Sequence, residues 1–280
     1  MSAKLSLGFS PCPNDCFIFD AMIHEKIDIE DLEFQIIMED VETLNKKAFS
    51  RSIDITKLSF HAFAHLTHDY VLLNSGSALG FGVGPLLISK KEILNAKSQI
   101  PNLRIAIPGK YTTANFLFSL AFPDAENKIE MLFSEIEQAV LNGDADAGVI
   151  IHESRFTYEA KGLKKVIDLG EWWEKETSSP IPLGGIVMKR NFSDDIKQKV
   201  NRIIRRSVEF AFTNPSSSMD FIKKHAQEMS EDVIIKHINL YVNKFSVDLG
   251  EEGSKSVKIF FNKTLEAGLL KNVNKEIFLK

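Results

Sequence analysis

The chain has 280 residues, of which 44% are hydrophobic and 26% are charged, the composition of an ordinary globular protein. The formal net charge is −4 and the basic residues form no continuous stripe, so nucleic-acid binding, which needs a concentrated positive face, is disfavoured. No segment reaches the ~18 apolar residues of a membrane span, and the first residues lack the pattern of a secretory signal. We therefore expect a cytoplasmic protein with neither nucleic acid nor membrane as a partner.

The start of the chain alternates predicted strands with predicted helices. Residues 4–10 form an alternating strand that Pro11 and Pro13 break, and Asn14 or Asp15 then caps a helix. In chain order the segments after the first strand are a helix over 15–26, a strand over 33–38, a helix over 40–50, a strand over 54–58, a helix over 59–67 and a strand over 70–74. Alternation with short connections predicts a mostly parallel sheet covered by helices.

A glycine-rich segment, residues 75–85, separates this series from a second one. The second series has predicted strands over 86–88, 103–107, 127–133, 145–151, 163–169 and 180–188, and predicted helices over 113–121, 136–141 and 171–176. The remaining segments are predicted helices over 193–212, 215–227, 230–242 and 251–267. This tail has no predicted strand of its own, so we expect it to pack on the first lobe.

The two series predict an α/β protein with two lobes and a ligand cleft between them. The first lobe is expected to comprise residues 1–85 together with 190–280, and the second lobe residues 86–189. Small ligands usually bind in clefts between domains, beside the carboxyl ends of strands and the amino ends of helices. Three positions in the sequence meet that criterion.

The first position is Lys57-Leu58-Ser59, at the end of a predicted strand and the start of a helix. A serine at a helix start leaves backbone N–H groups for an anion, and Lys57 adds a positive charge. The alternative, of equal weight, is a plain helix cap beside a solvated lysine.

The second position is the segment 108–114, where Gly109 allows a turn and Lys110, Thr112 and Thr113 precede a helix. This pattern is typical of an anion site at a helix start, although it lacks the full phosphate-loop spacing. A carboxylate suits it as well as a phosphate does, and the alternative is an ordinary capped helix. We favour an anion site that includes Thr113 and Ala114.

The third position is His152-Glu153, which follows the very apolar predicted strand 145–151. An imidazole titrates near neutral pH and can accept a proton from a bound substrate. An arbitrary histidine is more often a packed or surface residue, but the place of His152 at a strand end favours a functional role. Glu153 or Arg155 is then a candidate for orienting the ring or for pairing with a substrate carboxylate.

The remaining residues that could bind a metal or react give weaker signals. His61 and His65 share one face of a predicted helix, but Ala62 stands where a zinc protease has glutamate, so we expect no metal. Cys12 and Cys16 are expected to be free thiols, one of which could line a pocket. The sequence has no dinucleotide-binding fingerprint and no phosphate loop, and we expect no cofactor.

Five segments together resemble the 1,4-dihydroxy-6-naphthoate synthase family of the futalosine route to menaquinone. They are residues 10–20, 54–59, 80–85, 108–114 and 146–158. The resemblance extends to about Arg190, and its most specific part ends in His152-Glu-Ser-Arg-Phe-Thr-Tyr158. One departure is Cys16, where the family pattern has threonine.

The resemblance implies a type II periplasmic-binding-protein-like fold that is used as an enzyme. It implies a lyase that cleaves cyclic dehypoxanthine futalosine to 1,4-dihydroxy-6-naphthoate and dihydroxyacetone. It also implies His152 as the proton acceptor and substrate contacts from Lys57, Leu58, Ser59, Thr113 and Ala114. The partner is then a small-molecule carboxylate, and a homodimer is compatible with the sequence.

Three alternatives stay open at this point. Chorismate dehydratase shares the fold and the pathway, although residues 146–158 argue against it. A solute-binding protein that performs no chemistry would have the same lobes, but it is normally exported. A metal-dependent hydrolase is the most distant alternative.

Overall fold

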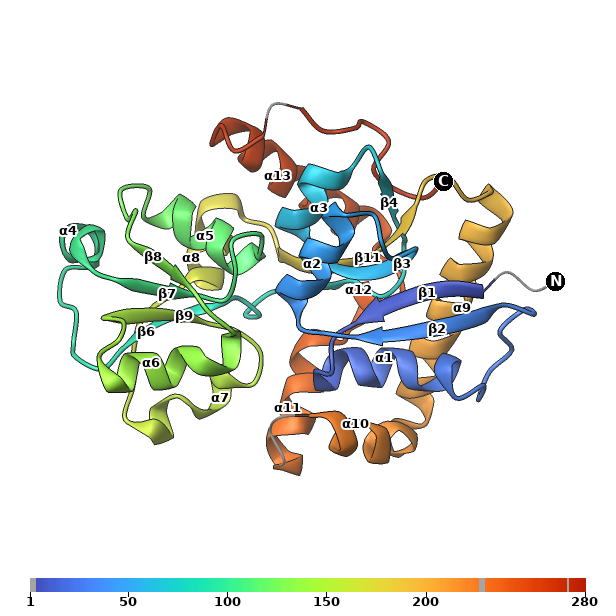
Figure 1. Ribbon diagram of the computed structural model, residues 1–280, viewed down its shortest axis with the longest axis horizontal. Coiled ribbons are helices and arrows are strands. Elements are labelled where there is room, and N and C mark those ends of the chain that lie inside the picture. Colours follow the sequence, from blue (N-terminus) through green and yellow to red (C-terminus); the bar gives the residue numbers. More distant parts are fainter. Residues whose placement is uncertain (1–3, 227–229, 271) are drawn as a thin grey trace. The chain divides into compact units, whose positions relative to one another are not determined.

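The computed structural model describes residues 4–226, 230–270 and 272–280 and divides the chain into two compact units (Figure 1). Unit 1 comprises Met1–Gly80 with Pro182–Lys280, and unit 2 comprises Phe81–Ile181. Among the described residues, no helix combines the length and the apolar character that crossing a membrane requires.

Unit 1 contains a sheet with the strand order β2-β1-β3-β11-β4, and β5 also pairs with β11. The strands are β1 (Lys4–Phe9), β2 (Glu33–Met38), β3 (Ile55–Ser59), β4 (Tyr70–Leu72), β5 (Ala78–Gly80) and β11 (Ile181–Lys189). β1 runs parallel to β2 and β3, whereas β11 runs antiparallel to β3 and β4. The mostly parallel prediction concerned the first series, whereas β11 is the strand predicted over 180–188 with the second series, and it supplies the antiparallel pairs with β3 and β4. Parallel neighbours need a crossover connection, and β11 instead enters this sheet directly from unit 2.

Helices cover both faces of the sheet of unit 1 (Figure 1). They are α1 (Pro13–Ile23), α2 (Val41–Phe49), α3 (Phe60–Leu66), α9 (Asp194–Thr213), α10 (Met219–His225), α11 (Glu231–Tyr241), α12 (Lys244–Val247) and α13 (Gly250–Glu266). On one face α1 and α9 share a core with β1, in which the rings of Phe9 and Phe19 stack with centroids 4.5 Å apart. The tail helices pack on unit 1, as the sequence predicts.

Three local predictions for unit 1 differ from the structure. Helix α1 begins at Pro13 rather than at Asp15, because proline suits the first helical position, where no N–H bond is required. The tail is not purely helical, because Phe278 forms a parallel bridge with Leu72. The N–H of Leu72 donates to the carbonyl of Ile277, and the N–H of Leu279 donates to the carbonyl of Leu72, each at 2.8 Å. Of the predicted helix 215–227, residues Pro215–Ser218 form a short 3-10 helix and Met219–His225 form α10, while residue 227 lies outside the described residues.

Unit 2 contains a second sheet, with the strand order β10-β6-β9-β7-β8. The strands are β6 (Leu86–Ser89), β7 (Ile105–Ile107), β8 (Lys128–Glu130), β9 (Ala147–Ile150) and β10 (Lys164–Asp168). β7 runs parallel to β8 and β9, whereas β6 runs antiparallel to β9 and β10. The antiparallel strand is again the one on which the chain enters the unit, and parallel and antiparallel pairs are equally frequent in this sheet.

The helices of unit 2 are α4 (Ala96–Gln99), α5 (Thr113–Ala121), α6 (Ile136–Asn142), α7 (Ser154–Thr157) and α8 (Leu169–Thr177). Helix α6 packs on β7 and β9, while α5 and α8 pack against each other (Figure 1). The core beneath α6 joins Ile136 and Val140 to Ile88 and Ile150. β9 is thereby buried along its whole length, which fixes the position of the residues that follow it.

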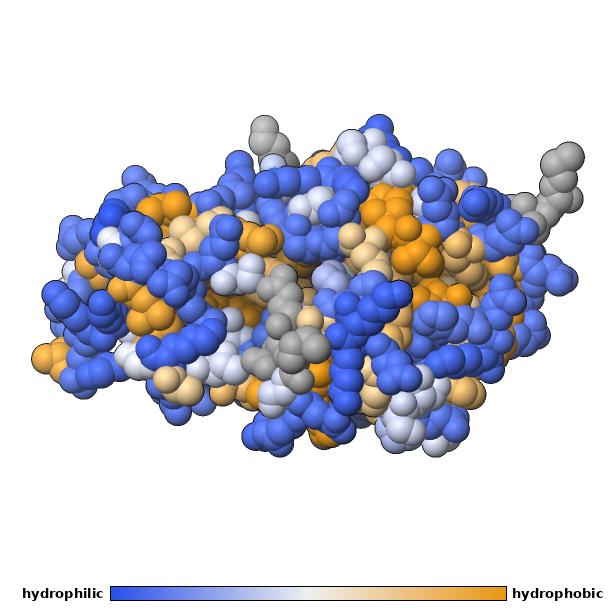
Figure 2. All heavy atoms as spheres, turned by 60° about the horizontal axis from the view of Figure 1, so that its bottom comes forward, coloured by the Kyte–Doolittle hydropathy of each residue, from blue (hydrophilic) through white to orange (hydrophobic). Residues whose placement is uncertain are grey.

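The surface is mostly hydrophilic, with apolar side chains in small scattered groups on the face that Figure 2 shows. The larger apolar side chains with substantial exposure include Phe81, Leu94 and Phe212. Scattered exposure of this kind is normal for a globular protein.

A close backbone contact in unit 2 gives a stability prediction. A Cβ added at Gly84 would lie 2.2 Å from the Cα of Gly170, so Gly84→Ala must displace main chain. We expect this variant to lose about 3 kcal/mol of unfolding free energy in urea titrations. Gly82→Ala is the control: it has a φ of 69° but no heavy atom within 4 Å of the added Cβ. It should lose only about 1 kcal/mol through backbone strain, and equal losses in both variants would contradict the packing argument.

A carboxylate that links three strands of unit 1 gives a pH prediction. Asp54 accepts from the N–H and Oγ of Ser6 at 3.0 and 2.7 Å and from Lys189 Nζ at 2.9 Å. Burial alone would raise the pKa of Asp54, but the hydrogen bonds from Lys189 and Ser6 together outweigh it and lower the pKa. A lowered pKa stabilises the fold above the unfolded value, and this contribution is lost as pH falls through the folded value.

We therefore expect Asp54→Asn to reduce the unfolding free energy at pH 7 and to reduce it much less at about pH 3. Urea titrations across this range measure the difference. Asp124→Asn, at an exposed position, should show little change at either pH. A loss in Asp54→Asn that does not depend on pH would show that the charge of Asp54 is irrelevant to stability.

Candidate functional site

Lys57 is the middle residue of β3 and is buried, with 5% of its surface exposed. Its Nζ donates to the carbonyl of Gly76 at 2.8 Å and lies 3.3 Å from Oδ1 of Asp15. The alternative of a solvated lysine is therefore wrong. The ammonium is paired inside unit 1, because a buried charge is tolerated only with a partner.

Asp15, the partner of Lys57, is itself held by several donors. Its Oδ2 accepts from the N–H and the Oγ of Ser10 at 3.1 and 2.8 Å. Its Oδ1 accepts from Nδ2 of Asn14 at 2.9 Å. The first turn of α1 is thereby bound to Lys57 in the middle of β3, which ties α1 to that strand.

Ser59 stands directly before α3, as predicted, but its side chain makes no capping hydrogen bond to the helix. Instead the N–H of Ser59 donates to Oδ1 of Asn45 at 3.1 Å, and Nδ2 of Asn45 donates to Oγ of Ser59 at 3.3 Å. Leu58 is also buried. Its carbonyl faces Gly184 of β11, where an added Cβ would lie 2.8 Å from that oxygen. Neighbouring elements, rather than a cap, fix residues 57–59.

In unit 2 the segment 108–114 forms the expected turn and helix start. Thr112 is the N-cap of α5: its Oγ1 accepts from the N–H of Asn115 at 3.2 Å and donates to the carbonyl of Gly109 at 2.8 Å. Thr113 and Ala114 are the first two helical residues and are buried. N–H groups at these positions have no acceptor within their own helix, which gives helix starts their affinity for anions.

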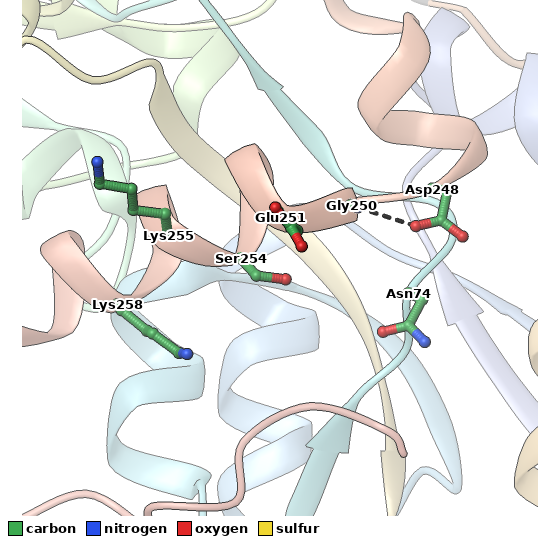
Figure 3. Close-up of a pocket in the computed structure, with 7 residues that line it drawn as sticks. All are labelled: Asn74, Asp248, Gly250, Glu251, Ser254, Lys255 and Lys258. Carbon is green, nitrogen blue, oxygen red and sulfur yellow. Dashed lines mark hydrogen bonds between the residues drawn. The ribbon is translucent and has the colours of Figure 1, made fainter.

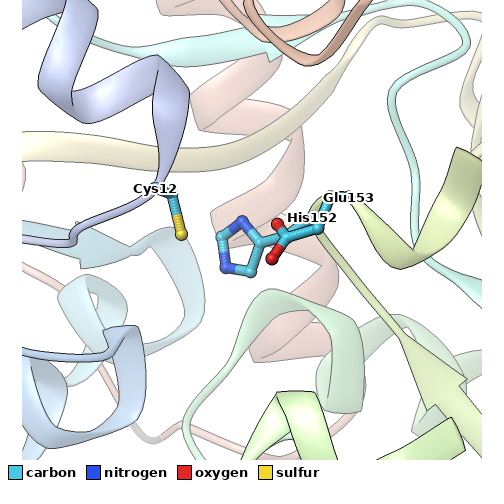
Figure 4. A group of neighbouring side chains, drawn as sticks. All are labelled: Cys12, His152 and Glu153. Atoms are coloured by element: carbon cyan, nitrogen blue, oxygen red, sulfur yellow. The ribbon is translucent and has the colours of Figure 1, made fainter. Parts of the chain in front are cut away.

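His152 lies two residues after the end of the buried strand β9 and is partly exposed (Figure 4). Its backbone has a φ of 58°, the left-handed region that non-glycine residues seldom occupy. The ring meets Phe133 edge to face, with centroids 4.9 Å apart and an interplanar angle of 63°. Strained backbone held in place by its surroundings is characteristic of functional positions.

The neighbours of His152 have different surroundings. Glu153, drawn beside it in Figure 4, is 9% exposed. Arg155 donates to Oδ2 of Asp168 at 2.5 Å and to the carbonyl of Gly84 at 2.6 Å, so its guanidinium braces unit 2. Arg155 is therefore a poorer candidate than the sequence suggested for orienting the imidazole or binding a carboxylate.

The two cysteines are free thiols, as predicted. Burial, followed by the charges of Asp15 and Asp20, raises the pKa of Cys16 well above its usual range, so this thiol is unreactive. Cys12 is buried and occupies the N-cap position of α1 (Figure 4). The rings of His61 and His65 on α3 lie 5.3 Å apart between centroids, and His61 is buried.

Unit 1 also contains a pocket of about 510 Å³ at the start of α13 (Figure 3). Its lining residues are Asn74, Asp248, Gly250, Glu251, Ser254, Lys255 and Lys258. The pocket mixes two carboxylates with two lysines, and Oδ1 of Asp248 accepts from the N–H of Gly250 at 2.8 Å. None of the residues predicted from the sequence to bind substrate lines it.

Sequence reasoning missed several residues that shape the candidate site. Asn14 and Asp15 looked like helix caps, whereas their side chains pair with buried groups. Asn45 and Gly76 lie far from residues 57–59 along the chain, and no local pattern marks them. The pairing of an acid after β1 with a lysine in β3 was the one available signal, because parallel neighbours end at the same edge.

Solved structures of other proteins have the same fold of two α/β units. The chain is similar to the Candida albicans CA3427 gene product, which has the generic periplasmic binding protein fold, with a TM-score of 0.69 and 14% identity over 99% of this chain and 98% of that one. It is more similar to protein AF1704 from Archaeoglobus fulgidus, with a TM-score of 0.90 and 36% identity over 95% of this chain and 98% of that one. The fold is thus of the two-lobed type II periplasmic-binding-protein kind.

Residues 5–266 match the model of the menaquinone biosynthesis family, and the chain belongs to that family. A relative from Thermus thermophilus named 1,4-dihydroxy-6-naphtoate synthase is 43% identical over 95% of both chains. A relative of the same name from Streptomyces coelicolor is 36% identical over 96% of both chains. Both similarities extend through the C-terminal helices, beyond the segments that carried the resemblance in the sequence.

The buried pair of Lys57 and Asp15 gives a prediction of its own. Lys57→Met should lower the unfolding free energy in urea by about 3–5 kcal/mol, because it leaves a carboxylate buried without its cation. The double variant Lys57→Met/Asp15→Asn should recover more than half of that loss, because no buried charge remains. Additive losses would mean that the two side chains do not interact.

Proposed function

We infer that this chain is a lyase that converts cyclic dehypoxanthine futalosine to 1,4-dihydroxy-6-naphthoate and dihydroxyacetone, with His152 as the general base. The observation that carries the role of His152 is its strained, left-handed backbone at the end of buried β9, with the ring held by Phe133. The names of the two relatives support the product of the reaction.

The proposed reaction requires one principal catalytic group, a proton acceptor. Removal of a proton from the substrate by the imidazole allows a carbon–carbon bond to break. The electron pair of that bond stays on one fragment, which takes a proton back from the imidazolium, so one molecule becomes two and the base is regenerated. Formation of an aromatic naphthalene ring supplies driving force. A positioned general base usually contributes ~10²–10⁴-fold in rate.

Substrate binding is assigned to two short segments. Within unit 1, Lys57 is ion-paired with Asp15. The Oγ of Ser59, which accepts from Asn45 and keeps a hydrogen to donate, is therefore better placed to bind a polar group beside Leu58 than the ammonium is. Within unit 2, the start of α5 at Thr113 and Ala114 suits the substrate carboxylate, since a helix N-terminus favours negative charge.

The test is product analysis by mass spectrometry after incubation with cyclic dehypoxanthine futalosine. The wild type should release 1,4-dihydroxy-6-naphthoate, and His152→Asn should fold normally and lose about 10²–10⁴-fold in kcat. His68→Asn, at an exposed position, should keep wild-type kcat.

Each other outcome would replace the proposal with a different function. Full activity in His152→Asn would remove the assigned role of the imidazole. Turnover of chorismate alone would indicate the dehydratase of the same pathway. Binding of the futalosine derivative without its consumption would indicate a binding protein.

A further inference from the structure

A chain of buried polar groups crosses unit 1 from α11 to β3. Nε2 of His237 lies 3.0 Å from Oδ1 of Asn14, and Nδ2 of Asn14 donates to Asp15. Asp15 pairs with Lys57, and Lys57 donates to the carbonyl of Gly76. His237 is fully buried, and the three side chains that follow it are each less than 7% exposed.

The direction of each hydrogen bond in this chain follows from its charged end. The Lys57 ammonium can only donate, and a carboxylate at Asp15 can only accept. The Asn14 amide must therefore turn its Nδ2 to Asp15, which turns its Oδ1 towards His237. It follows that Nε2 of His237 carries a hydrogen and donates it to Asn14.

The geometry shows why a buried histidine is useful at this position. Without a donor at His237, Oδ1 of Asn14 loses its buried partner, and the amide that donates to Asp15 is held at one end only. Buried polar networks are rigid when every member is satisfied and costly when one is missing. Lys57 directly precedes Leu58 and Ser59, so a change at Asp15 reaches the segment assigned to substrate binding.

We propose that His237 is a positioning residue for substrate binding, which acts through Asn14 and Asp15 on Lys57 and the backbone of residues 57–59. The proposal rests on the proposed function of that segment. It gives α11, one of the helices of the C-terminal segment, a role in the site, although His237 is 223 residues from Asn14 along the chain.

The test compares two variants that differ in one hydrogen-bond donor. His237→Met removes the donor, whereas His237→Gln keeps an N–H near the position of Nε2. We expect His237→Met to raise KM for cyclic dehypoxanthine futalosine by about 10-fold while kcat changes by less than about 3-fold, because binding is lost but His152 is untouched. His237→Gln should restore KM to within about 3-fold of the wild type. The Kd for 1,4-dihydroxy-6-naphthoate should change in parallel, and the exposed control His68→Met should change neither value.

A purely structural role would lower stability in both His237 variants and leave KM of the folded fraction unchanged, and this result would overturn the proposal. If the wild type does not consume the substrate, the proposed function fails and the present inference fails with it. Wild-type turnover together with an unaltered KM in His237→Met overturns the inference alone.

A measurement that needs no folded Met variant is ¹⁵N NMR of the histidine rings, with His237→Gln for assignment. A protonated Nε2 of His237 is expected, and an Nε2 without hydrogen would contradict the proposal.

Discussion

The pairing of Lys57 with Asp15 inside unit 1 is the constraint on which the arrangement of that unit's candidate site depends. A lysine in a buried strand is costly, and its cost is offset only because Asp15, Gly76, Ser10 and Asn14 are placed to satisfy both charges. The requirement joins β1, α1 and β3. It also explains the tight turn at Gly76, which has a φ of 87° and where a Cβ would lie 2.0 Å from Ile186. The hydrogen bond from Lys57 and the packing against Ile186 thus both favour the same backbone conformation at Gly76.

In unit 2 the position of His152 depends on an apolar strand, β9, rather than on a buried ion pair. β9 is buried by α6 on one side and lies between β6 and β7, so its end cannot shift, and the chain turns sharply at His152 to begin α7. The left-handed backbone conformation of His152 is held in place by the buried strand and by the contact between its ring and Phe133. Arg155 fixes the following turn to Asp168 and Gly84. The imidazole is therefore positioned by its backbone as much as by side-chain contacts.

Much of the fold could be predicted from the sequence, because apolar periodicity and turn residues are local signals. The strand 33–38 and the helix starts after Asp40, Thr112 and Ser193 are examples. What could not be predicted depended on partners distant in sequence: the direction of β11, the surroundings of Lys57, and Asn45 in place of a cap at Ser59. The role assigned to His152 came from its place after a strand and from resemblance, and no local pattern pointed to His237.

The pairing of residues 277–279 with β4 has a consequence for the behaviour of the molecule in solution. β4 ends the main path of the sheet, and an uncovered edge strand offers N–H and carbonyl groups to any passing extended peptide. Here the chain's own terminal segment occupies Leu72 on both its donor and its acceptor side. Residues 277–279 therefore occupy this part of the edge, and an extended peptide from another molecule cannot pair with Leu72 there.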